Sequence, residues 1–166
     1  TGLLGGDMRA IEKTYNLLQQ VSGRAGRSKQ QGKVFIQTYY PKQPVIQSLQ
    51  KRDRKKFVEQ SLKDRQDFMI PPFGFMTSLI ISGSSRAKTE MYSKKITYVS
   101  KIPENLSILG PVEAPIFLLR GQYRFRILIK GNSRKLVNKY TKLLIQNCPI
   151  PPGIRLVIDV DPYSFM

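Results

Sequence analysis

The chain has 166 residues, enough for one full domain with an appendage or for two small domains. Its 28 basic and 11 acidic residues give a formal net charge of +17, so polyanions, and nucleic acid before membranes, are the expected partners. One cysteine and no histidine exclude an intramolecular disulfide, a zinc cluster and histidine acid–base catalysis within this chain. No apolar run approaches the roughly 18 residues of a membrane span and no signal peptide opens the chain, so we expect a soluble, cytoplasmic protein.

The first predicted element is an amphipathic helix over residues 8–21. Its apolar residues recur at intervals of three and four, which places them along one side of a helix. They are Met8, Ile11, Tyr15 and Leu18, flanked by Leu17 and Val21. Asp7 stands where an N-cap belongs, and Gly23 stands where the helix is expected to stop. After a glycine-rich turn, the β-branched and aromatic residues 33–40, closed by Pro41, predict a strand.

A second helical region is predicted over residues 45–67, with a break near Asp53. Only a thin apolar stripe that includes Phe57 accompanies its many charged residues. The segment IPPFG, residues 70–74, follows directly, and its prolines and glycine cannot continue a helix. We therefore place a domain boundary at this segment.

The rest of the chain predicts strands and helices in a recognisable order. The expected elements are a strand (75–83), a helix (86–101), a strand or strand pair (106–119), a strand (122–130), a helix (134–147) and a strand (154–160). This β-α-β-β-α-β order predicts an α+β sandwich of the ferredoxin-like type. The last helix has an apolar face and a polar face. The apolar face comprises Leu136, Val137, Tyr140, Leu143 and Leu144, and the polar face comprises Lys135, Asn138, Lys139 and Lys142.

The first stretch that carries chemistry is QQVSGRAGR, residues 19–27. Arg24 and Arg27 are three residues apart, and they follow Gly23 and Gly26 directly. Residues at this spacing can point the same way from a helix end, and glycine lets the backbone approach a ligand closely. Guanidinium groups suit phosphate oxygens and stay charged at any working pH. The spacing alone is compatible with a phosphate clamp and equally with an ordinary basic turn.

The residues around this pair resemble a known motif. The pattern Q-x-x-G-R-x-G-R is similar to motif VI of superfamily 2 helicases, in which the glutamine and both arginines face the γ-phosphate of ATP across a cleft between two RecA-like lobes. The runs GGDMRAIEKTYNLL and GKVFIQTYYP on either side resemble the PriA family of replication-restart DNA helicases (primosomal protein N′). IPPFG, ILGPVEAP, RGQYRFRILIK and the terminal DVDPYSF resemble the same family. The resemblance therefore spans almost the whole chain.

The resemblance implies roles for the residues of the motif. Gln20 would sense the γ-phosphate, with Gly23 and Gly26 beside the nucleotide. Arg24 and Arg27 would neutralise the γ-phosphate as it leaves, and Arg27 is the better candidate for an arginine finger, although which of the two acts so depends on the absent lobe. Such a finger contributes on the order of 10³ to 10⁵ in rate, because it stabilises charge that grows on the transferred group.

Other parts of the family's machinery are missing from the chain. By the same resemblance, Asp7 and Arg9 would belong to the segment that couples the nucleotide state to DNA binding. The chain contains no G-x-x-x-x-G-K-[ST] loop, no Asp-Glu pair placed for Mg²⁺, and no cysteine set for the family's zinc sites. ATP, Mg²⁺ and zinc are therefore expected cofactors of a longer parent. The chain begins at Thr1 without an initiator methionine, so we expect a fragment that does not hydrolyse ATP alone.

The second chemical feature is a basic stretch without acidic residues, from Ala114 to Ile158. Its basic residues are Arg120, Arg124, Arg126, Lys130, Arg134, Lys135, Lys139, Lys142 and Arg155. Within the strand 122–130, alternation places Arg124, Arg126 and Lys130 on one face and Tyr123, Phe125, Ile127 and Ile129 on the apolar face. The expected DNA-binding residues are Arg120, Arg124, Arg126, Lys130, Lys139 and Lys142.

The repulsion among like charges in such a patch falls when it binds the phosphates of a nucleic acid, and this binding releases counterions. No motif for reading bases is present, so we expect sequence-independent contact with forked or single-stranded DNA. Contact with the rest of the parent protein and simple solvation are the alternatives for the basic face. Tyr123 and Phe125 are expected to pack in the core rather than to stack on bases.

Arg134 and Asn138 form one further candidate site. They are four residues apart at the start of the last predicted helix, so both can reach one groove. In the family, a basic residue and an amide at this place resemble the pocket for the acidic C-terminal tail of single-stranded-DNA-binding protein. The chain has an asparagine where a longer glutamine is expected, and an exposed helix start is the alternative.

The leading interpretation is a fragment of a 3′-to-5′ helicase of the PriA type, a parent that would recognise stalled forks and rebuild the primosome. Residues 1–42 would end its RecA-like second lobe, 43–70 would form a helical connector, and 71–166 would form a basic C-terminal domain. A nucleic-acid-binding module of ribosomal-protein type and a pure assembly domain for primosome proteins are the alternatives. The first of these leaves QVSGRAGR unexplained.

Overall fold

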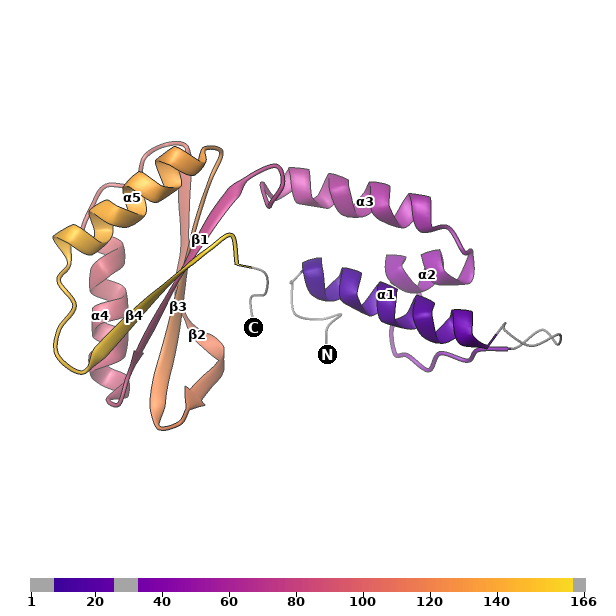
Figure 1. The fold of residues 1–166 in the computed structure, drawn as a ribbon, viewed down its shortest axis with the longest axis horizontal. Helices are drawn as coiled ribbons and strands as arrows, with labels where there is room; N and C mark the ends of the chain where they lie inside the picture. The colour runs from indigo at the N-terminus through magenta and orange to yellow at the C-terminus, as the bar shows by residue number, and fades with distance from the viewer. Residues whose placement is uncertain (1–7, 26–32, 163–166) are drawn as a thin grey trace. The chain divides into compact units, whose positions relative to one another are not determined.

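The computed structural model describes residues 8–25 and 33–162, and its elements fall into two units (Figure 1). The unit Thr1–Asp64 contains α1 (Met8–Arg24), α2 (Pro44–Gln50) and most of α3 (Arg54–Asp67). The unit Arg65–Met166 contains β1 (Phe75–Gly83), α4 (Arg86–Tyr98), β2 (Leu106–Leu119), β3 (Gln122–Gly131), α5 (Arg134–Asn147) and β4 (Ile154–Val160). The division lies within α3, ahead of the IPPFG segment.

A small apolar cluster holds the three helices of the first unit together. Tyr15 of α1 stacks on Phe57 of α3, with ring centroids 4.0 Å apart and ring planes 7° apart. Val45 and Ile46 of α2 complete the cluster. On α1, Tyr15 is 2% exposed, whereas Leu17, beside it in the sequence analysis, is 62% exposed. The buried side of α1 is thus narrower than its apolar residues predict.

The break expected near Asp53 separates α2 from α3. Arg52 has a positive φ of 51°, which ends the helical run. The Asp53 carboxylate then accepts a hydrogen bond from the backbone N–H of Lys56 at 2.9 Å. A carboxylate in this position satisfies one of the free N–H groups of the first turn, so Asp53 caps the start of α3.

The strand expected over residues 33–40 is absent, and this prediction is wrong. The backbone there forms no ladder, and Phe35 and Tyr39 are 90% and 98% exposed. A β-strand is stable only when a neighbouring strand pairs with its N–H and C=O groups. The described residues of the first unit contain no other strand that could pair with it.

The second unit is the predicted β-α-β-β-α-β sandwich. Its strands pair in the order β2-β3-β1-β4, and all neighbouring pairs are antiparallel. Figure 1 shows α4 and α5 on the same face of this sheet. The core lies between the helices and that face, and it is formed by Leu79, Ile81, Tyr92, Ile96, Leu106, Ile127, Ile129, Val137, Tyr140, Leu144 and Cys148. The Tyr92 hydroxyl donates to the Cys148 carbonyl at 2.9 Å within this core.

The two helices of the second unit begin in the same way. Each follows a strand through a Gly-x-Ser-Arg sequence, at residues 83–86 and 131–134. A Cβ atom on Gly83 would lie 2.6 Å from Thr89 Oγ1 and 2.7 Å from Ile154 Cδ1. A Cβ atom on Gly131 would overlap the Leu106 side chain. Glycine at each junction therefore lets the helix turn back closely onto the sheet.

We expect Gly83→Ala to lower the free energy of unfolding by about 1–3 kcal/mol, because the added methyl group overpacks the contact with Thr89 and Ile154. Urea denaturation followed by circular dichroism measures this change. Gly23→Ala is the matched control, since nothing lies within 4 Å of a Cβ at that position. Equal stability of the Gly83→Ala variant and the unaltered chain would contradict the close junction.

Candidate nucleic-acid interface

The outward side of α5 is lined with lysines. Lys135, Lys139 and Lys142 are exposed, whereas Val137 and Tyr140 are buried against the sheet. The two faces of α5 are thus the ones that the sequence predicts, except that Leu143, expected on the apolar face, is 40% exposed. Lys139 and Lys142 are three residues apart and project from the same side of the helix. Within the described residues, no hydrogen bond or ion pair engages these three lysines.

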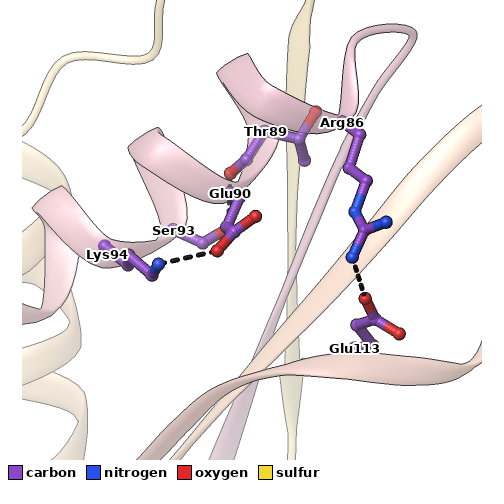
Figure 2. Close-up of polar contacts among 6 residues, drawn as sticks. All are labelled: Arg86, Thr89, Glu90, Ser93, Lys94 and Glu113. Atoms are coloured by element: carbon purple, nitrogen blue, oxygen red, sulfur yellow. Dashed lines mark hydrogen bonds and ion pairs between the residues drawn. The ribbon is translucent and has the colours of Figure 1, made fainter.

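α4 adds positive charge to the same side of the domain. Lys88, Lys94 and Lys95 are exposed, and Glu90 is the acidic residue of this helix. The Glu90 carboxylate lies 2.6 Å from Lys94 Nζ (Figure 2). This hydrogen bond and the charge of Lys94 lower the pKa of Glu90, so the carboxylate is ionised and neutralises that lysine. The remaining lysines, which we call the helical basic surface, are Lys88, Lys95, Lys135, Lys139 and Lys142.

The basic residues of β3 lie on the opposite face of the sheet. Ile127 and Ile129 are in the core beneath α4 and α5, so Arg124, Arg126 and Lys130 must point away from the helices. This alternation is the one that the sequence predicts. The expected DNA-binding residues are therefore divided, because Lys139 and Lys142 lie on the helical side and the three β3 residues do not. They do not form one continuous patch.

Two of the β3 residues are already engaged by the domain itself. Arg126, one of the expected DNA-binding residues, is only 8% exposed, so little of its side chain is accessible to a ligand. It lies on a central strand between Ile80 of β1 and Val112 of β2, where neighbours on both sides limit its access to solvent. Lys130 donates from Nζ to the carbonyl of Phe68 at 2.9 Å and borders a cavity of about 400 Å³.

Arg134 at the start of α5 has two partners that the sequence analysis missed. Its guanidinium lies 2.8 Å from the Asp161 carboxylate and 5.1 Å from the centre of the Phe75 ring. Asn138 is exposed one turn later on the same side of α5. Asp161 and Phe75 are far from Arg134 in sequence, and no local pattern identifies such partners. The guanidinium is thus held in place while its side chain stays 59% exposed.

Arg86 at the start of α4 has the same kinds of partners. It lies 2.9 Å from the Glu113 carboxylate (Figure 2) and 5.3 Å from the centre of the Phe117 ring. The two Gly-x-Ser-Arg junctions therefore build similar surroundings at two places. They differ one turn later, where α5 has the neutral Asn138 and α4 has the acidic Glu90.

The motif at the end of α1 is described only in part. Gln20, Gly23 and Arg24 are exposed, and α1 continues through Gly23 to end at Arg24. Gln20 and Arg24 are four residues apart, so they share one side of the helix. Of the other predicted positions, Arg9 lies in the first turn of α1, and Asp7, Gly26 and Arg27 lie outside the described residues.

Comparisons with known proteins bear on the whole chain. Residues 66–163 match the family described as the primosomal protein N C-terminal domain. The chain belongs to the PriA family. It is 38% identical over 159 residues to a replication restart protein PriA of Rickettsia conorii, an alignment that covers 96% of the chain and 24% of that protein. The PriA proteins of Synechocystis and Bacillus subtilis are 36% and 31% identical; the alignments cover 95% and 96% of the chain and 19% and 20% of those proteins.

The PriA family match coincides with the second unit of the structure. It begins at residue 66, and that unit begins at Arg65. The first unit lies outside this match, but the alignment with the Rickettsia conorii protein covers 96% of the chain and therefore includes most of it. The chain spans about a quarter of the length of that relative. In the part of the chain that the structure describes, no helix is long and apolar enough to cross a membrane.

Proposed function

We propose that the chain is the C-terminal part of an ATP-dependent 3′-to-5′ DNA helicase that recognises stalled forks and restarts replication in the cytoplasm. Membership of the PriA family and the name replication restart protein carried by its relatives support this proposal. The remaining motor parts, with the ligands for Mg²⁺ and zinc, would lie in segments outside this chain. Forked and single-stranded DNA and other primosome proteins are then its partners.

The helical basic surface is the observation that carries the DNA-binding role. Lys135, Lys139 and Lys142 face solvent without partners in the described residues, and α5 contains no acidic residue. Lysines placed in this way contact phosphates without reading bases, which suits a protein that must act at forks of any sequence. A module of ribosomal-protein type would share this fold, but it would not account for the alignment with PriA proteins through α1.

We expect the double variant Lys139→Ala and Lys142→Ala to bind duplex and forked DNA more weakly. The slope of log affinity against log salt concentration should fall by about 0.9 for each lost phosphate contact. Fluorescence anisotropy of labelled DNA at several salt concentrations measures both effects. The matched control is Lys139→Arg with Lys142→Arg, which keeps the charge and should keep the slope. An unchanged slope in the alanine variant would argue against DNA contact at this surface.

The end of α1 supplies the proposed nucleotide-binding residues. Gln20 and Arg24 are exposed on one side of the helix, as residues that complete a site from across a cleft must be. Gly23 lies between them and leaves open space beside the backbone. Arg24 and Arg27 would stabilise charge on the leaving phosphoryl group, as a cationic side chain does in phosphoryl transfer.

We expect the 166-residue chain to show no DNA-stimulated ATP hydrolysis. In the complete parent protein, Arg24→Ala or Arg27→Ala, whichever removes the finger, should lower ATP turnover by about 10³ to 10⁵. A steady-state ATPase assay with single-stranded DNA tests both statements. ATP turnover by the 166-residue chain alone, or full activity in both arginine variants, would refute the proposal that this chain supplies one side of a shared ATP site.

Arg134 and Asn138 are the proposed site for the acidic C-terminal tail of single-stranded-DNA-binding protein. Phe75 and Asp161 hold the Arg134 guanidinium in position, so little side-chain freedom is lost when a second carboxylate binds. Asn138 one turn later supplies an amide toward the same region. At the equivalent place on α4, Glu90 is a carboxylate already paired with Lys94, so it offers no amide donor to an acidic tail.

We expect Arg134→Ala to weaken binding of the tail peptide roughly 10- to 100-fold, since a hydrogen bond to a charged group contributes about 1.5–3 kcal/mol. Fluorescence polarisation of the labelled peptide measures this affinity. Arg86→Ala is the matched control, because Arg86 loses the same kinds of partners and lies beside Glu90. Equal affinities of the two variants would remove the tail site.

A further inference from the structure

The face of the sheet opposite α4 and α5 carries a short row of arginines. Strand register places Arg124 of β3 and Arg155 of β4 on either side of Ser82 in β1. Ile154 and Leu156 pack against the core, so Arg155 between them points to the opposite face, as Arg124 does. We call Arg124, Ser82 and Arg155 the arginine row. Its two arginines are separated by two strand spacings, about 10 Å.

Among the described residues, no acidic side chain pairs with the arginine row. Arg155 is exposed and Arg124 is half-buried, and neither has an ion-pair or hydrogen-bond partner in the described residues. The nearest acidic residue on this face, Asp159, pairs with Ser78, four residues along β1 from Ser82, or about 13 Å. Arg120, in the turn between β2 and β3, is also exposed. This end of the face is therefore positively charged.

Exposed apolar side chains continue from the arginine row. Val112 and Val157 belong to the next row of the same face, and they are 59% and 37% exposed. Leu109, in the row beyond, is 51% exposed. Charged and apolar groups are thus side by side on this face, whereas the helical basic surface presents lysines.

We propose that this second face binds single-stranded nucleic acid, with the arginine row on the phosphates and the apolar side chains under the bases. Unpaired bases expose their faces, which stack on guanidinium planes and make apolar contact with aliphatic side chains, whereas a duplex hides its bases. The sheet separates this face from the helical basic surface. The domain therefore has two nucleic-acid surfaces, and the proposed function gains a place for the unpaired strand of a fork.

This inference rests on the proposed DNA-binding role, and it is tested with short oligo-dT and a duplex of unrelated sequence. We expect the double variant Arg124→Ala and Arg155→Ala of the full chain to bind oligo-dT more weakly. Its log–log salt slope should fall by about 0.7 for each arginine, the value for single strands. Its duplex binding should stay unchanged. Arg124→Lys with Arg155→Lys is the matched control, which keeps the charge and most of the slope.

A second variant protects the test from a folding defect in the first. Val112→Glu places a negative charge beside the arginine row, at a side chain that is 59% exposed. This variant should also weaken binding of oligo-dT and leave binding of the duplex unchanged. Unchanged oligo-dT binding in both variants, or an equal loss for duplex and oligo-dT, would overturn the second surface. If the double variant Lys139→Ala and Lys142→Ala also binds the duplex normally, the proposed DNA-binding role itself fails.

Discussion

The alternation of side chains along β3 is the constraint on which the rest of the second unit depends. Phe125, Ile127 and Ile129 are buried on one side, so every second residue must point to the other side. That requirement sends Arg124 away from α5 and its lysines. A single basic stretch of sequence therefore becomes two surfaces on opposite faces of one sheet. A shift of register by one residue would bury the arginines and expose the core.

The repeated junction Gly-x-Ser-Arg shows how the helices reach their places. Gly83 and Gly131 permit close approach to the sheet, and Arg86 and Arg134 then tie each helix start to a carboxylate and an aromatic ring. Exposed ion pairs of this kind contribute little stability, generally under about 1 kcal/mol. Their larger effect is on position, because a guanidinium held by two partners is already placed for a ligand. The two junctions differ one turn later, where α5 has the neutral Asn138 and α4 has Glu90 paired with Lys94.

Much of this arrangement can be predicted from local sequence patterns. The faces of α5 and the order of helices and strands along the second unit follow from periodicity and from the placement of prolines and glycines. The burial of Arg126 and the partnership of Arg134 with Asp161 do not, because they depend on residues brought together by the sheet. The prediction of a strand over residues 33–40 fails for a related reason, because strand propensity does not form a strand without a partner strand to pair with. The roles of the α1 motif rest on family resemblance alone.

The division of the charges into two surfaces is tested most directly by nuclear magnetic resonance of the ¹⁵N-labelled chain. Amide shifts would be followed while oligo-dT and a duplex are added in separate titrations. The structure predicts that the duplex perturbs α5 around Lys139, and that oligo-dT perturbs β3 and β4 around Arg124 and Arg155. Perturbation of the same residues by both ligands would contradict two separate surfaces.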